Sequence, residues 1–223
     1  MSAKQETGIL SKIIKYQDQD AILRVFFKDR IVLIYAPGIF KTTSKNRNNL
    51  FEGALINFEF FQARLTTKMS RLKTATLIYN WKFIDQEQQF WIPNWLKLLQ
   101  AIDTTSEEFF NFYQYALRNF NYENNIYLTT YLYYLSLELL GYKQNFNSCV
   151  IDKRRTQISN FDLSSGGFLC IYHSMNKAPI EILKSLNYLT KSYSDFLNKT
   201  TRKTVNDIYQ IFKDFISNNS YLH

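Results

Sequence analysis

The sequence predicts an α+β protein, in which an N-terminal OB-fold β-barrel is followed by an all-α helical domain carrying a degenerate zinc-knuckle insertion. Three observations predict this order. Short strand-like segments fill residues 8–81, and amphipathic helical patterns follow in 82–223. Both cysteines and one of the two histidines fall within 149–173. We therefore expect a barrel domain at 1–81 and a helical domain at 82–223, with few breaks because only 6 Gly and 3 Pro occur in 223 residues.

The strand-like segments are short, rich in β-branched and aromatic residues, and bounded by polar turns. They are residues 8–17, 21–27, 30–38, 54–65 and 72–81. The tripeptide "KDR" at 28–30 predicts a tight hairpin between the second and third segments. Five strands are the number in an OB-fold, a small Greek-key barrel that often binds oligonucleotides. An SH3-like barrel uses the same number of strands and remains an alternative.

The helical patterns cover residues 94–102, 105–117, 124–141, 178–189 and 204–216. Pro93 suits the start of the first helix. Thr105 and Glu108 predict a capping box for the second, and Gly141 suits the position just after the third. The third is apolar, but Thr129, Ser136 and similar residues interrupt it, so a buried helix is expected rather than a membrane span.

The net charge of +8 is concentrated in the first part of the chain. Residues 1–81 hold 13 Lys/Arg against 6 Asp/Glu, whereas 82–223 hold 14 against 13. This asymmetry indicates an acidic partner for the barrel, nucleic acid first, with solubility alone as the alternative. The candidate contacts are Lys12, Arg24, Lys28, Lys41, Lys45, Arg47, Arg64, Lys68, Arg71 and Lys73.

Aromatic residues such as Phe26, Phe27, Tyr35, Phe40 and Phe60 alternate with these cations. OB-folds bind single strands through a cationic groove and aromatic side chains on which bases stack. Most of the aromatics are expected in the core, and the cations of the loops are the better candidates because turns project their charges. Phosphate contacts carry no sequence code, so little base preference is expected.

Two knuckle-like sequences lie in the segment 149–173. Cys149 is followed three residues later by Asp152, and Cys170 three residues later by His173. Thiolate, imidazole and carboxylate are all ligands of tetrahedral zinc, so these four residues could hold one structural Zn²⁺. Aspartate is uncommon in structural sites, and a metal-free remnant with two buried cysteines is the alternative. Neither knuckle has a neighbouring general base or an open ligand position, so its role is expected to be structural.

The sequence contains no catalytic Ser/His/Asp order, phosphate-binding Gly-rich loop or paired-carboxylate constellation near the basic strands, and we expect a protein that is not an enzyme. A polar N-terminus without an apolar segment and only two cysteines predict a cytoplasmic protein with no membrane partner.

The order of these features resembles the bacterial RecO recombination mediators. "GILSKIIKYQDQDAILRVFFKDRIVLIYAPG" is similar to the family's opening hairpins, and "LFEGALINFEFFQARL" to its GAL-x-x-F strand. "LELLGYKQNFNSCVID" and "FDLSSGGFLCIYH" resemble the helix end and the two knuckles of the family. Asp152 and His173 stand where many members have cysteines, and "KTTSKNRNNL" (41–50) is less basic than usual in the family.

The resemblance implies a recombination mediator that binds single- and double-stranded DNA, anneals complementary strands and helps load recombinase onto coated single strands. It further implies nucleoid association and three partners: RecR, the acidic C-terminal tail of the single-stranded-DNA-binding protein (SSB) and, indirectly, RecA. Arg154 and Arg155 are the candidate tail-binding residues, since adjacent guanidiniums can bind carboxylates bidentately. The residues by themselves leave an RNA- or ribosome-associated OB-fold protein as the alternative.

Overall fold

The computed structural model describes residues 3–63, 68–82 and 85–219. The chain forms two compact units, Met1–Phe120 and Asn121–His223, which we describe separately. The strands of the first unit end at Tyr79 and its first helix begins at Gln86, so secondary structure changes where the sequence predicts. The helices α1 (Gln86–Ala101) and α2 (Glu107–Asn119) nevertheless belong to the same compact unit as the strands. A domain division at residue 81 remains a prediction.

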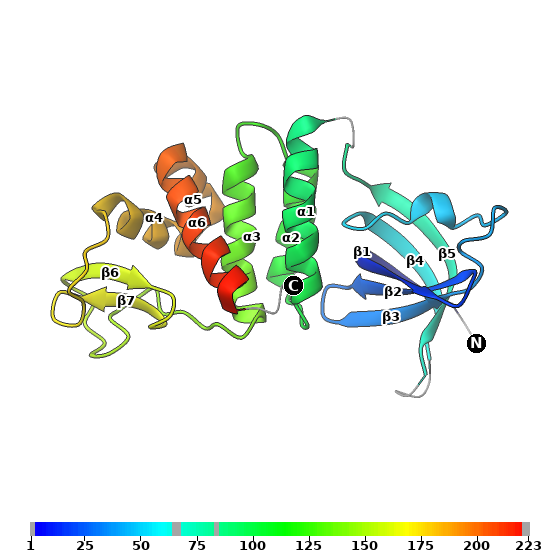
Figure 1. The fold of residues 1–223 in the computed structure, drawn as a ribbon, viewed down its shortest axis with the longest axis horizontal. Helices are drawn as coiled ribbons and strands as arrows, with labels where there is room; N and C mark the ends of the chain where they lie inside the picture. The colour runs from blue at the N-terminus through cyan, green and yellow to red at the C-terminus, as the bar shows by residue number, and fades with distance from the viewer. Residues whose placement is uncertain (1–2, 64–67, 83–84, 220–223) are drawn as a thin grey trace. The chain divides into compact units, whose positions relative to one another are not determined.

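The five expected strands are present and form a closed barrel (Figure 1). They are β1 (Lys4–Tyr16), β2 (Asp20–Phe26), β3 (Ile31–Ala36), β4 (Leu55–Phe61) and β5 (Ser70–Tyr79). Their order around the barrel is β1-β2-β3-β5-β4, and β1 pairs with β4. Only β3 and β5 run parallel among these neighbours, and this pairing closes the barrel. A five-stranded closed Greek-key barrel of this kind has the OB-fold architecture, and the predicted fold class is confirmed.

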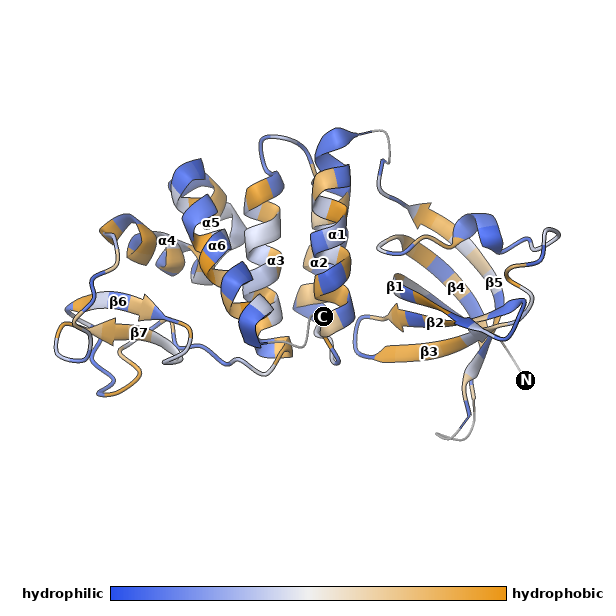
Figure 2. Ribbon diagram, in the orientation of Figure 1, coloured by the Kyte–Doolittle hydropathy of each residue, from blue (hydrophilic) through white to orange (hydrophobic). Residues whose placement is uncertain are grey.

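Alternation of buried and less buried residues along strands such as β4 builds the barrel core, and Figure 2 shows β4 with mixed hydrophobic and hydrophilic residues but β3 as mostly hydrophobic. Leu23, Val25, Ile34 and Phe58 are among the fully buried side chains that fill the interior. Gly53 precedes β4 at a φ of +81°. A Cβ atom there would lie 2.6 Å from Nε1 of Trp81, so the "GAL" sequence needs glycine for both conformation and space.

Two of the predicted helix starts differ from the structure. The helix α1 begins at Gln86, where the side chain of Asp85 accepts hydrogen bonds from two backbone N–H groups, and Pro93 lies inside the helix. The cap of α2 is Ser106, whose hydroxyl accepts from the N–H of Phe109, so the predicted capping box at Thr105 is wrong. Both starts are set by the residue that has extended backbone and can reach the third N–H of the helix. The sequence placed the cap of α2 one residue too early and the start of α1 two turns too late.

The second unit contains the helices α3 (Asn125–Leu139), α4 (Ile180–Lys191), α5 (Tyr193–Lys199) and α6 (Arg202–Asn219). The helix α3 is buried over most of its surface, as predicted. Gly141 follows the end of this helix at a φ of +86°, and the N–H groups of Gly141 and Tyr142 donate back to the carbonyls of Glu138 and Leu137. In the part of the chain that the structure describes, no helix is long and apolar enough to span a membrane.

Between α3 and α4 lies a small hairpin of β6 (Ile158–Asp162) and β7 (Gly167–Cys170). The rings of Phe146, Phe161 and Phe168 pack together on it, and Phe161 also approaches Phe212 of α6. This aromatic cluster packs the hairpin against α6. The second knuckle begins at Cys170, the last residue of β7, and the first knuckle is hydrogen-bonded to β7 through the N–H of Val150 and the carbonyl of Phe168.

Candidate functional site

Each knuckle is a tight backbone turn that brings its first and fourth residues to the same side. In the first turn, the N–H of Lys153 donates to the carbonyl of Cys149 over 3.0 Å. In the second, the N–H of His173 donates to the carbonyl of Cys170 over 3.0 Å, directly after β7 ends. The two-residue spacing in the sequence therefore has a local structural cause, because one turn places both side chains of a knuckle toward one point.

The double glycine ahead of Cys170 sets the path of β7. Gly167 is the first residue of β7 and has a φ of +134°. It lies beside the backbone of Asn145. A Cβ atom on Gly167 would lie 2.2 Å from the carbonyl oxygen of Asn145. Only glycine fits this close approach, which brings the chain leading to Cys149 alongside the strand that ends at Cys170.

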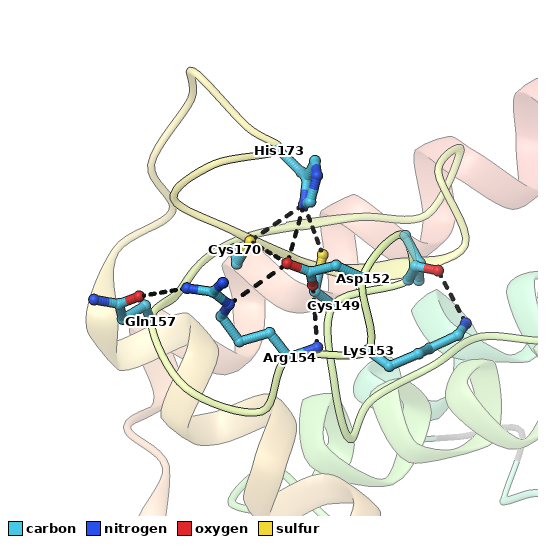
Figure 3. Close-up of polar contacts among 8 residues, drawn as sticks. Cys149, Asp152, Lys153, Arg154, Gln157, Cys170 and His173 are labelled. Atoms are coloured by element: carbon cyan, nitrogen blue, oxygen red, sulfur yellow. Dashed lines mark hydrogen bonds and ion pairs between the residues drawn. The ribbon is translucent and has the colours of Figure 1, made fainter.

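The four predicted ligands converge on one point (Figure 3). Their donor atoms all lie within 4.8 Å of one another. Nδ1 of His173 is 3.5 Å from Sγ of Cys149 and 3.3 Å from Sγ of Cys170, and Oδ2 of Asp152 is 3.7 Å from Sγ of Cys170 and 3.6 Å from Nδ1 of His173. Zinc bonds of about 2.0–2.3 Å place tetrahedral ligands about 3.5 Å apart. Four of the six separations therefore match the edges of a zinc tetrahedron, and the other two are no longer than 4.8 Å.

The surroundings of the cluster favour the charged forms that bind a cation. Burial raises the pKa of the Cys149 thiol. Hydrogen bonds from the backbone N–H groups of Asp152, Cys170 and Ile151 and the contact with His173 lower the pKa by more, and together these effects bring it down to about 7. The N–H of Arg154 donates to Asp152 over 3.0 Å and is the main cause of the lowered pKa of this carboxyl. The four residues thus fit one structural metal ion, with Zn²⁺ the ion that this donor set suits best. Nε of Arg154 also lies 3.5 Å from Asp152, a contact that a metal-free carboxylate would equally use.

A second candidate site lies on the outer face of the barrel, across β1, β2 and β3. Ile14 pairs with Ile22, which in turn pairs with Tyr35, and Arg24 pairs with Leu33. Large apolar side chains remain exposed here: Leu33 at 45%, Tyr16 at 41% and Ile14 at 38%. We call Ile14, Tyr16, Ile22, Leu33 and Tyr35 the outer platform.

The two tyrosines of the outer platform meet edge to face, with ring centroids 6.1 Å apart. Asp20 fixes this arrangement, because its carboxylate accepts hydrogen bonds from the hydroxyl of Tyr35 and from the N–H of Gly38. The hydroxyl of Tyr35 is the main cause of the lowered pKa of Asp20. An aromatic pair with one exposed ring, Tyr16, and one partly buried ring, Tyr35, held by an ionised carboxylate is suited to stacking on flat ligands.

Sequence reasoning named Tyr35 among the strand aromatics that could stack on bases, without assigning it to a face, and missed Ile14, Tyr16 and Leu33. The signal was available in the alternation of "KIIKY", which puts Lys12, Ile14 and Tyr16 on one side of β1. Of the aromatics proposed, Phe26, Phe27 and Phe60 are buried, whereas Phe40 is 39% exposed.

The predicted cations differ in their surroundings. Lys12, Lys41, Lys45, Arg47, Lys68 and Arg71 are exposed, and no carboxylate of the described residues forms an ion pair with them. Lys28 pairs with Glu107 and Lys73 with Glu59, each over 2.7 Å. Arg64 lies outside the described residues.

Arg24 has a structural position rather than an exposed one. Its side chain is only 14% exposed, and its guanidinium donates to the carbonyls of Leu99 (2.9 Å) and Ile102 at the end of α1. These carbonyls are among those that a helix end leaves without partners. Arg24 therefore closes the C-terminus of α1 against β2, and we leave it out of the candidate nucleic-acid surface.

The segment between β3 and β4 supplies three of the free cations. Lys41 follows the turn at Gly38, and Lys45 and Arg47 flank the start of a short 3₁₀ helix, Arg47–Asn49. Lys41 contributes to the low pKa of Asp20. Arg71 on β5 lies opposite Tyr35 in the register of β3 and β5. The outer platform thus has cations along its margins.

The second unit has a pocket of about 290 Å³ between the hairpin and α4. Its apolar lining includes Phe146, Phe168 and Leu183, and its cations are Arg155 and Lys184. Of the two arginines predicted to bind a partner, only Arg155 lines this pocket. Arg154 instead lies 4.6 Å above the ring of Tyr172 and donates to Gln157.

No family model matches the chain. A curated relative does: the DNA repair protein RecO of Mesoplasma florum is 28% identical over 181 residues, which cover 76% of this chain and 67% of the relative. The match supports the RecO family. It extends over most of the chain and agrees with the OB-type barrel followed by helices, so the resemblance found in the sequence is confirmed.

Two features depart from the pattern of the RecO family described above. The knuckles hold Asp152 and His173 in place of the second cysteines, yet the donor atoms still converge. The segment after β3 is less basic, yet Lys41, Lys45 and Arg47 are all exposed.

Proposed function

We propose that the chain is a recombination mediator without catalytic activity, which binds single- and double-stranded DNA, anneals complementary strands and helps load recombinase onto coated single strands. The RecO match supports a role in DNA repair and recombination. The observation that carries the proposal is the outer platform, an exposed aromatic and aliphatic surface with free cations along its margins.

The outer platform has the chemistry that single-stranded DNA requires. Stacking on exposed aromatic rings is worth about 1–3 kcal/mol per base and is tolerant of sequence, while cations bind the phosphates. Tyr16 and Tyr35 offer the rings, and Lys12, Lys41 and Arg71 offer cations near them. Annealing follows from the same chemistry, because phosphate contacts reduce repulsion between two complementary strands and leave base edges unread.

Replacing Lys41, Lys45 and Arg47 together by alanine should weaken oligonucleotide binding and flatten its salt dependence. Three phosphate contacts on a single strand account for a change of about 2 in the slope of log K against log salt. Fluorescence anisotropy with a short oligothymidylate, across a salt series, measures both effects. All three residues are exposed, so the thermal midpoint should stay unchanged.

The matched control replaces Lys143, Lys191 and Lys203, three exposed lysines of the second unit, and should leave the slope as in the wild type. Tyr16→Ala should weaken binding without changing the slope, because stacking releases no counterions. If the first triple variant binds with wild-type affinity and slope, the surface lies elsewhere.

The same measurement separates DNA from RNA as the partner. We expect the chain to bind single-stranded DNA, and complementary oligonucleotides should anneal faster in its presence. Stronger binding to matched RNA or to structured ribosomal RNA would favour the alternative, an RNA- or ribosome-associated OB-fold protein.

We propose the pocket at the hairpin and α4 as the site for the acidic tail of SSB. An acidic peptide with an apolar end needs a hydrophobic recess and cations at its rim, and the pocket has Phe146, Phe168 and Leu183 beside Arg155 and Lys184. Arg154 is left out, because its guanidinium is already engaged by Asp152, Gln157 and Tyr172. RecR and RecA are further proposed partners, without a site assigned.

A labelled acidic peptide that ends in a large apolar residue should bind the full chain. The double variant with Arg155→Ala and Lys184→Ala should bind this peptide with an affinity at least about tenfold lower. Loss of two charge-assisted contacts supports this magnitude. Lys203→Ala, an exposed cation on α6, is the control and should bind as the wild type does. Wild-type affinity in the double variant would remove the pocket from the tail site.

A further inference from the structure

The tip of the two knuckles presents an apolar surface that neither the metal site nor the pocket explains. The first and fourth residues of each knuckle point toward the cluster and Val150 packs against it, whereas the other residues between them are exposed. Ile151 is 59% exposed, and Ile171 and Tyr172 are 45% and 63% exposed. Met175, just after the second knuckle, is fully exposed. Several large apolar side chains exposed together indicate a binding surface.

One aromatic ring at this tip is held in place by a cation. The guanidinium carbon of Arg154 lies 4.6 Å from the ring centroid of Tyr172, so one knuckle covers a residue of the other. Asp152 and Gln157 hold the same guanidinium through contacts of 3.5 and 3.0 Å, as Figure 3 shows. The ring and the guanidinium therefore form a fixed, flat pair at the surface.

The charge around the tip is positive. Residues 149–177 contain Lys153, Arg154, Arg155 and Lys177 against two carboxylates. Asp152 belongs to the ligand cluster, and Asp162 accepts hydrogen bonds from Ser164 and Ser165 at the opposite end of the hairpin. The exposed tip thus combines an aromatic ring, aliphatic side chains and cations without a free carboxylate in the described residues.

We propose that the knuckle tip is a second contact for single-stranded nucleic acid, in which an unpaired base stacks on Tyr172 and the phosphates on either side bind Lys153 and its neighbouring cations. A stacking ring among cations is how proteins hold single strands without reading their sequence. The cluster has a mechanical part in this proposal, because the fold of both knuckles around one point sets Tyr172 beside Arg154. The proposal extends the nucleic-acid binding proposed for the barrel to a separate surface of the second unit.

Substitutions of the ring test this proposal in the full chain with an oligothymidylate of about 30 nucleotides as the probe, a length that exceeds the site of one OB-fold. Tyr172→Ala should bind at least about fivefold more weakly, since one lost stack costs about 1 kcal/mol or more. Tyr172→Phe and Tyr172→Trp keep a ring and should bind as the wild type does. All three substitutions remove the hydroxyl, so if the hydroxyl and not the ring were responsible, all three variants would bind the oligonucleotide more weakly.

Tyr122→Ala is the matched control, because Tyr122 is also exposed (65%) and lies beneath a guanidinium, that of Arg202 at 5.0 Å, but outside the knuckles. It should leave the affinity unchanged. In a second measurement on the wild type, an oligonucleotide carrying 5-iodouracil should cross-link to residues 170–177 on irradiation.

Equal affinity of the wild type and Tyr172→Ala would overturn the proposal, as would a cross-link map that omits the knuckles. Either result would leave the tip to a protein partner and would not affect the barrel surface. Absence of oligonucleotide binding by the wild type would contradict the proposed function as well, so the two failures are distinguishable.

Discussion

Purified chain should contain about one equivalent of zinc, and removal of the metal should unfold the knuckle segment. The four donor atoms lie within 4.8 Å of one another, close enough to share one ion, and structural zinc contributes its binding free energy to folding. Cys170→Ala should abolish stoichiometric zinc and lower the free energy of unfolding by at least about 4 kcal/mol. Elemental analysis and thermal unfolding with and without a chelator measure both effects.

The unusual aspartate ligand allows a sharper test of the same site. Asp152→Cys replaces the carboxylate by a thiolate and should raise the affinity for zinc, because three thiolates and one imidazole are a common structural set. Lys153→Ala, an exposed neighbour within the same turn, is the control and should keep wild-type zinc content. Substoichiometric zinc in the wild type, with a midpoint that chelation leaves unchanged, would identify the cluster as a metal-free remnant.

Arg24→Ala should destabilise the first compact unit by about 3 kcal/mol. The substitution removes the partner of two carbonyls at the end of α1, and each buried polar group left without a hydrogen bond costs about 1–3 kcal/mol. Arg24→Lys keeps the charge but loses the planar fork that reaches both carbonyls, so it should be intermediate. Denaturant unfolding followed by tryptophan fluorescence measures this, since Trp81, Trp91 and Trp95 lie in the same unit.

Lys28→Ala is the matched control for Arg24. Lys28 also belongs to the barrel and pairs with a helix residue, Glu107, but both side chains are more than half exposed, so its loss should cost less than about 1 kcal/mol. If Arg24→Ala keeps wild-type stability and instead binds oligonucleotide weakly, Arg24 belongs to the nucleic-acid surface, as the sequence suggested.

The sequence determined the features that depend on neighbouring residues. Short runs rich in β-branched and aromatic residues, bounded by polar turns, located all five barrel strands, because such side chains suit a pleated, half-buried surface. The two-residue spacing located the ligand cluster, because a single turn brings the first and fourth side chains of each knuckle together. Gly141 located the end of α3 for the same local reason. The uneven charge was likewise visible without any structure.

Only the tertiary structure decided which of these residues are available to a partner. Arg24 is removed from the surface by carbonyls 75 and 78 residues away, and Lys28 and Lys73 are paired with Glu107 and Glu59. The outer platform exists because β1, β2 and β3 align Ile14, Ile22 and Tyr35 in register. The pocket exists because α4 packs beside the hairpin. These are long-range pairings, and local periodicity does not encode them, because it fixes the face of a strand but not the neighbour that covers it.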